Sequence, residues 1–122
     1  MQRSICIMIT QAPYGTVGAA EGIRHVNGAL KEGFSVVAAL VDDGVWLARP
    51  GQKPGQSGFT SLSDALSASL SPASGPAPQV VAHRSSLEER GLTPADLIPG
   101  VELVDDAGLA EVITSMQSLL RF

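Results

Sequence analysis

Residues 4–10 read Ser-Ile-Cys-Ile-Met-Ile-Thr, a nearly unbroken apolar run that is rich in β-branched side chains. Such a run is typical of a parallel strand that is covered on both faces, because its side chains are then buried on either side. Residues 34–41 repeat the pattern as Phe-Ser-Val-Val-Ala-Ala-Leu-Val. Between the two runs, apolar residues recur at helical spacing, namely Ala19, Ile23, Val26 and Leu30. We therefore expect a strand–helix–strand unit with a right-handed parallel crossover.

The rest of the chain continues to alternate between strand and helix patterns. Apolar runs predict three further strands, at residues 79–82, 101–104 and 118–122. Helix patterns begin behind Ser61, at Ser86 and behind Asp105. The pattern at Ser86 has the Ser-x-x-Glu form of a capping box. We expect one α/β domain over residues 1–122, a three-layer α/β/α sandwich around a mostly parallel five-stranded sheet.

The composition limits the class of protein. Apolar residues make up 44% and charged residues 16% of the chain, a globular profile, and no apolar run approaches the roughly 18 residues of a membrane span. The formal net charge of -4, with Lys and Arg scattered, gives no electrostatic surface for nucleic acid. No secretory cleavage site follows Met1, and a single cysteine cannot form an intrachain disulfide. We expect a cytoplasmic protein without membrane or direct nucleic-acid partners.

Candidate site residues are sought at the carboxyl ends of the predicted strands, because open parallel sheets bind ligands there. Tyr14 follows the first strand and Asp42 the second. His83 and Arg84 follow the third, where a histidine could shuttle protons and an arginine could hold an anion. The alternative for these two residues is a solvated surface loop. For Asp42 and Asp43 we favour a turn or helix cap over an acid/base pair, since adjacent strand residues point to opposite faces.

Ser86, Trp46 and Cys6 could each have either a structural or a functional role. Ser86 lacks the Gly-x-Ser-x-Gly elbow of an esterase, so helix capping explains its hydroxyl better than nucleophilic catalysis. Trp46, between Val45 and Leu47, could lie on a contact surface or simply cap the core. Cys6 lies in mid-strand, where burial raises the thiol pKa and blocks access, which favours a structural role. The sequence predicts no catalytic residue, metal or cofactor in the chain itself.

Several segments together resemble the DsrE/DsrF-like family, which includes the Tus sulfur-relay subunits and the small YchN-type proteins. They are Ala12-Pro13-Tyr14-Gly15, Asp42-Asp43-Gly44-Val45, Gly51-Gln52-Lys53-Pro54-Gly55, Ser86-Leu87-Glu88-Glu89-Arg90-Gly91-Leu92 and Leu119-Leu120-Arg121-Phe122. Each is short, but their shared order along nearly the whole chain is fairly specific. The second, fourth and fifth look closest to the DsrF/TusC branch.

The resemblance carries an expectation about function. Family members of the DsrE/TusD type have a persulfide-forming cysteine at the position that matches His83, upstream of Gly91. Histidine cannot hold a sulfane sulfur. The resemblance therefore implies a non-catalytic subunit of a DsrEFH/TusBCD-like sulfur-relay complex, serving sulfur oxidation or tRNA thiolation, in a trimer or hexamer with DsrE/DsrH-like or TusD/TusB-like subunits. The rival hypothesis is a homo-oligomeric small-molecule or anion-binding protein, or an enzyme of the same fold, that uses His83 and Arg84.

Overall fold

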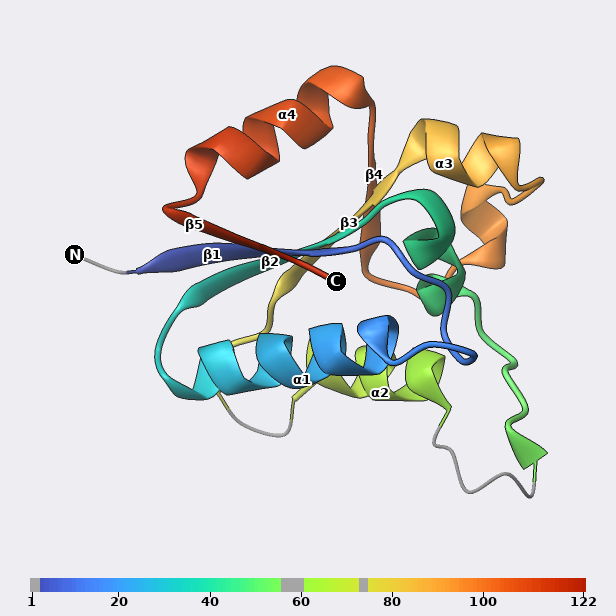
Figure 1. Ribbon diagram of the computed structural model, residues 1–122, viewed down its shortest axis with the longest axis horizontal. Coiled ribbons are helices and arrows are strands. Elements are labelled where there is room, and N and C mark those ends of the chain that lie inside the picture. Colours follow the sequence, from blue (N-terminus) through green and yellow to red (C-terminus); the bar gives the residue numbers. More distant parts are fainter. Residues whose placement is uncertain (1–2, 56–60, 73–74) are drawn as a thin grey trace.

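The centre of the molecule is a five-stranded sheet in which all neighbouring strands are parallel, in the order β4-β3-β2-β1-β5 (Figure 1). The computed structural model describes residues 3–55, 61–72 and 75–122. The strands are β1 (Ser4–Ile9), β2 (Ser35–Leu40), β3 (Gln79–His83), β4 (Val101–Val104) and β5 (Ser118–Arg121). The predicted α/β class and five-stranded parallel sheet are confirmed. The assignment of the whole chain to a single domain stays a prediction.

Helices form a layer on each side of this sheet. The helices α1 (Gly18–Lys31) and α2 (Leu62–Leu70) lie on one face, and α4 (Asp106–Ser115) lies on the other (Figure 1). The chain moves outward from β1 to β4 and then returns past β1 to form β5, so the right-handed crossover puts α4 on the opposite face. Within the described residues, no helix has both the length and the apolar character that a membrane crossing needs.

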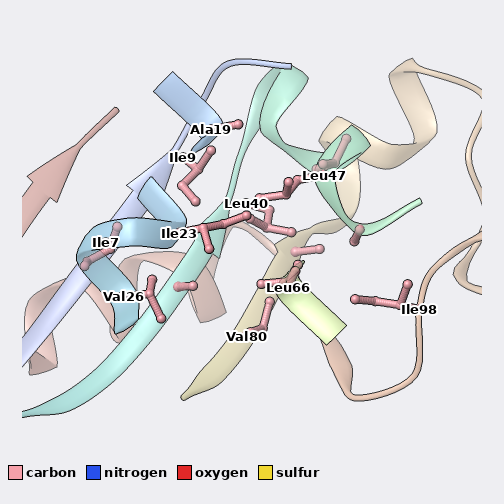
Figure 2. Packing of buried hydrophobic residues seen from close by; sticks show 14 of the residues in the cluster. Ile7, Ile9, Ala19, Ile23, Val26, Leu40, Leu47, Leu66, Val80 and Ile98 are labelled. Carbon is pink, nitrogen blue, oxygen red and sulfur yellow. The ribbon is translucent and has the colours of Figure 1, made fainter. Parts of the chain in front are cut away.

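The larger part of the core lies between the sheet and the α1–α2 layer. Figure 2 shows Ile7, Ile9 and Leu40 of the sheet packed beside Ile23 of α1 and Leu66 of α2. The layer on the other face is thinner, and no residue of α4 is fully buried. Its partly buried side chains Leu109, Val112 and Ile113, together with Met116 just after the helix, cover Cys6, Val37, Ala39 and Val81.

Short elements gather at the carboxyl edge of the sheet. They are α3 (Arg84–Glu89) and the 3-10 helices η1 (Asp42–Ala48) and η3 (Pro94–Asp96). The apolar segment Val45-Trp46-Leu47 lies inside η1, with Val45 and Leu47 buried. The helix expected at Ser86 begins two residues earlier, at Arg84, so the predicted capping box is wrong. The hydroxyl of Ser86 instead forms hydrogen bonds with the Asp42 N–H and with the imidazole of His83.

Other predicted caps are confirmed. The Ser61 hydroxyl accepts a hydrogen bond from the Asp64 N–H at the start of α2. The Asp105 carboxylate accepts the Gly108 N–H at 2.7 Å at the start of α4. These side chains satisfy backbone N–H groups that the first turn of a helix leaves without partners. They fix where α2 and α4 begin, and in α4 this leaves the neighbouring Asp106 available for another contact.

Candidate functional site

The predicted site residues fall into two groups at the carboxyl edge. Hydrogen bonds join His83, Ser86 and Asp42 into one network. Tyr14 and Trp46 line a separate hollow on the α1–α2 side of the edge. The remaining predicted residue, Arg84, is exposed at the first position of α3. Whether any of these side chains acts in function stays a prediction, but their surroundings limit what each can do.

The network centres on the imidazole of His83. Its Nδ1 lies 2.8 Å from the Ser86 hydroxyl, and its Nε2 lies 2.6 Å from Oδ1 of Asp106. The Ser86 oxygen also accepts the Asp42 N–H at 2.9 Å. One neutral tautomer satisfies all three contacts: Nε2–H donates to Asp106, and Nδ1 accepts the serine proton. The network therefore joins the ends of β2 and β3 to the first residue of α4.

This arrangement restrains the chemistry of the residues in it. Ser86 is 2% exposed, so its hydroxyl is closed off from a substrate. Both ring nitrogens of His83 already have partners inside the chain. To act as a base or a metal ligand, His83 would have to give up one of these hydrogen bonds. Within the described residues, no group of three or more His, Cys, Asp or Glu side chains is arranged to hold a metal ion.

Asp106 belongs to this network, although the sequence alone did not single it out. It lies 23 residues from His83, and no spacing rule connects two residues that far apart. A usable signal does exist, because both residues follow the carboxyl ends of strands that became neighbours, β3 and β4. Pairing of His83 with Val104 in the sheet places Asp106 beside the imidazole.

The charged residues around the network differ in how far they are neutralised. Arg90 donates to Oδ1 of Asp43 at 2.8 Å and to the backbone oxygen of Ser86 at 3.1 Å. The Arg84 side chain has no hydrogen bond or ion pair within residues 3–55, 61–72 and 75–122. Asp42 has a left-handed backbone, with φ 53, which non-glycine residues seldom adopt. Of the two arginines beside the network, Arg84 is therefore the one left to meet an external anion.

The hollow beside Tyr14 and Trp46 has a volume of about 530 Å³. It is formed by the loop after β1 and by the segment that runs from η1 into the following loop. Its lining residues are Ala12, Pro13, Tyr14, Trp46, Arg49, Pro50, Gly51 and Gln52. Trp46 is half-buried and packs against the core, which agrees with the core-capping alternative weighed from the sequence. Arg49 and Gln52 were not singled out from the sequence, although Gln52 lies in one of the resembling segments.

Cys6 is the only cysteine in the sequence. It belongs neither to the His83 network nor to the lining of the hollow. Its side chain is fully buried in β1, under α4. Burial raises the pKa of the Cys6 thiol to about 11, because removal of water disfavours the thiolate. Nucleophilic attack and sulfur transfer need an accessible thiolate, and burial disfavours one at Cys6 in the folded chain.

The parallel order of the strands, the helices on both faces and the polar network at the carboxyl edge define a small doubly wound α/β protein. The model of the DsrE/DsrF-like family matches residues 3–122. The chain therefore belongs to the DsrE/DsrF-like family, which confirms the resemblance seen in the sequence. At the level of the family, this membership supports a role related to sulfur relay. Members of the family form oligomeric complexes.

Individual proteins agree with this assignment. An uncharacterised protein of Methanopyrus kandleri is 30% identical over 118 residues, which cover 97% of this chain and 93% of that protein. The YchN protein of E. coli has the same fold, with a TM-score of 0.82, 24% identity and full coverage of both chains. A protein of unknown function from Methanobacterium thermoautotrophicum has a TM-score of 0.70 and 17% identity, covering 99% of this chain and 100% of its own. At these identities the two structures show the fold alone.

Proposed function

We propose that the chain is a non-catalytic subunit of a DsrEFH/TusBCD-like sulfur-relay complex in the cytoplasm. It carries no sulfur itself and shapes the site of a cysteine-bearing partner of the DsrE/DsrH or TusD/TusB type, within a trimer or hexamer. The burial of Cys6 is the observation that carries this proposal. A persulfide forms on an accessible thiolate, and this thiol is enclosed in the sheet with its pKa raised to about 11.

The edge around His83 suits the same role. The resemblance aligns His83 with the persulfide cysteine of other members, and here the imidazole is held by Ser86 and Asp106. Arg84, the next residue, offers an exposed cation without a partner among the described residues. A partner's persulfide is an anion, and a guanidinium stabilises an anion through charge-assisted hydrogen bonds. This edge can therefore recognise a loaded partner without accepting its sulfur.

A loading experiment tests whether the chain carries sulfur. The folded protein is incubated with inorganic polysulfide and weighed intact, beside the variants Cys6→Ser and His83→Cys. We expect no sulfur adduct on the wild type or on Cys6→Ser, and an adduct on His83→Cys, whose new thiol lies in a partly exposed position at the carboxyl edge. A stoichiometric adduct on the wild type that disappears in Cys6→Ser would overturn the proposal.

A binding experiment tests the subunit role. The protein is mixed with a cysteine-bearing homologue from the same organism, and the complex is measured by sedimentation. Arg84→Gln should weaken the complex by about tenfold or more, the usual loss for a charge-assisted hydrogen bond. Arg24→Gln is the matched control, because Arg24 is also exposed but lies on α1 and pairs with Glu21. If the protein sediments as a monomer both alone and when mixed with the homologue, the proposal is contradicted.

The second candidate is a homo-oligomeric small-molecule or anion-binding protein that uses His83 and Arg84. The guanidinium of Arg84 favours it, because it is exposed and has no hydrogen bond or ion pair to another described residue. This candidate predicts that the protein purifies as a self-contained trimer or hexamer and binds a simple anion in the absence of any homologue. Loss of that binding in Arg84→Gln, without any complex with a cysteine-bearing homologue, would select it over the subunit role.

A further inference from the structure

The hollow beside Trp46 has the position and the size of a ligand site. It opens next to the carboxyl ends of β1 and β2, where open parallel sheets bind small molecules. Its volume of about 530 Å³ falls within the usual range of small-molecule pockets. The His83 network belongs to the ends of β2 and β3 and supplies none of the lining residues. The hollow is therefore distinct from the edge used in the proposed function.

Gln52 makes the wall of this hollow rigid. Its Nε2 donates to the backbone oxygens of Trp46 and Arg49, at 3.1 and 3.0 Å. Its Oε1 accepts the Tyr14 hydroxyl at 2.9 Å and the Ser63 N–H at 3.2 Å. The amide thus uses both of its protons and both of its acceptor positions. The side chain fixes the wall in place and leaves nothing over for a ligand.

Tyr14 belongs to the same wall. Its hydroxyl also accepts the Leu62 N–H at 3.0 Å, which ties the loop after β1 to the start of α2. Its backbone is left-handed, with φ 70, a conformation that is strained for a bulky residue. Such strain persists only where the surroundings hold it, and it is concentrated at functional sites. The loop is thus held in one shape before any ligand arrives.

The groups left to meet a ligand are one cation, on Arg49, and the flat apolar surfaces of Trp46 and the prolines. Arg49 is the one charged residue of the lining, and its side chain has no hydrogen bond or ion pair within the described ranges. Its guanidinium carbon lies 5.7 Å from the centroid of the Trp46 ring. Pro13 and Pro50 add apolar surface. The nearby Asp96 is held by Thr93, whose two hydrogen bonds lower the pKa of that carboxyl more than Arg49 does.

We propose that this hollow binds a small planar anion, with a flat apolar body against Trp46 and the prolines and a carboxylate on Arg49. A guanidinium recognises a carboxylate through two parallel hydrogen bonds, and its stacking on an aromatic ring leaves the N–H groups free at its edge. The ring and the prolines favour a flat body because they offer broad apolar faces. Among the described residues the lining holds one arginine and no carboxylate, which favours an anion over a cation as the ligand.

The test uses Trp46 as its own reporter, since it is the only tryptophan in the sequence. Its indole N–H gives one resolved signal in a nitrogen-15 NMR spectrum. Benzoate is titrated as the probe, with neutral benzamide and ring-free acetate as matched controls. We expect benzoate to shift the signal in a saturable manner and both controls to bind about tenfold more weakly or worse. A shift that never saturates, or equal binding of benzamide, would overturn the proposal.

Two arginine variants locate the anion. Arg49→Gln keeps a polar side chain at this surface position but removes the charge and the guanidinium, so benzoate binding should weaken about tenfold or more. Arg84→Gln removes a positive charge beside the His83 network, outside the hollow, and should leave benzoate binding unchanged. Melting curves check that both variants fold. The inference fails if Arg49→Gln binds benzoate as the wild type does, or if Arg84→Gln is the variant that loses binding. Neither result bears on sulfur loading.

Discussion

The imidazole Nε2 of His83 lies 2.6 Å from Oδ1 of Asp106, which joins the last residue of β3 to the first residue of α4. The two ends of this contact differ in environment, with the side chain of His83 15% exposed and that of Asp106 86% exposed. An ion pair or hydrogen bond with one solvated partner contributes at most about 1 kcal/mol. The contact therefore orients the imidazole more than it stabilises the protein.

Removal of the imidazole should cost more than removal of its carboxylate partner. His83→Ala leaves the buried Ser86 hydroxyl without its acceptor, so we expect the free energy of unfolding to fall by about 1–2 kcal/mol. Asp106→Ala should cost less than about 1 kcal/mol, because water replaces the lost partner. Urea denaturation measures both, with the exposed Arg84→Ala as the control near zero. Equal stability of all three variants would show that the network contributes nothing.

Loss of the Gln52 side chain should destabilise the loops around the hollow. Gln52→Ala removes four hydrogen bonds, one each to Tyr14, Trp46, Arg49 and Ser63. Unsatisfied polar groups in partly buried positions predict a loss of about 1–3 kcal/mol in the free energy of unfolding. Gln79→Ala is the control, since it loses one exposed hydrogen bond to Glu102. Equal midpoints in urea for the two variants would contradict the role of Gln52.

Two glycines should respond to alanine in opposite directions. A Cβ at Gly44 would overlap the backbone oxygen of Ile9, which cannot move without disturbing the end of β1. We expect Gly44→Ala to lower the free energy of unfolding by more than about 3 kcal/mol or to prevent folding. Gly28 lies within α1 with open space around its Cα, so Gly28→Ala should stabilise the protein by about 0.5–1 kcal/mol. Thermal melts of the pair check both signs.

The buried thiol predicts a dependence of stability on alkaline pH. Burial raises the pKa of Cys6 from 9.0 to about 11, so the folded protein holds this proton more tightly than the unfolded chain. Below pH 9 both states keep the proton and the stabilisation is fully present. As the pH rises towards 11, the unfolded chain loses the proton first, and the free energy of unfolding falls by about 3 kcal/mol in all.

Comparison with Cys6→Ala isolates this effect, since the other titrating groups are common to both proteins. The stability of the wild type relative to the variant should be constant below pH 9 and should decline above it, as followed by urea denaturation at each pH. A difference that stays constant up to pH 11 would show that the thiol ionises in the folded protein as easily as in the unfolded chain.

Much of the fold could be predicted because the strands and helices follow from the spacing of apolar residues that are close in sequence. The apolar runs of β1 and β2 are continuous, and the helical spacing between them admits few other arrangements. The caps at Ser61 and Asp105 were also predictable, since a cap involves residues only three positions apart. The capping box at Ser86 failed for a related reason. Its Ser-x-x-Glu pattern is local, whereas the hydroxyl is used by Asp42 and His83 from other segments.

The sequence by itself determined the α/β class, the strand positions, the single thiol in the first strand and the set of strand ends where a site could form. Only the tertiary structure decided which of those residues meet: Asp106 with His83, and Gln52 with Tyr14. The reason is physical. Secondary structure follows from side-chain periodicity over a few residues, but these contacts depend on the order and register of strands, which bring distant residues together at one edge.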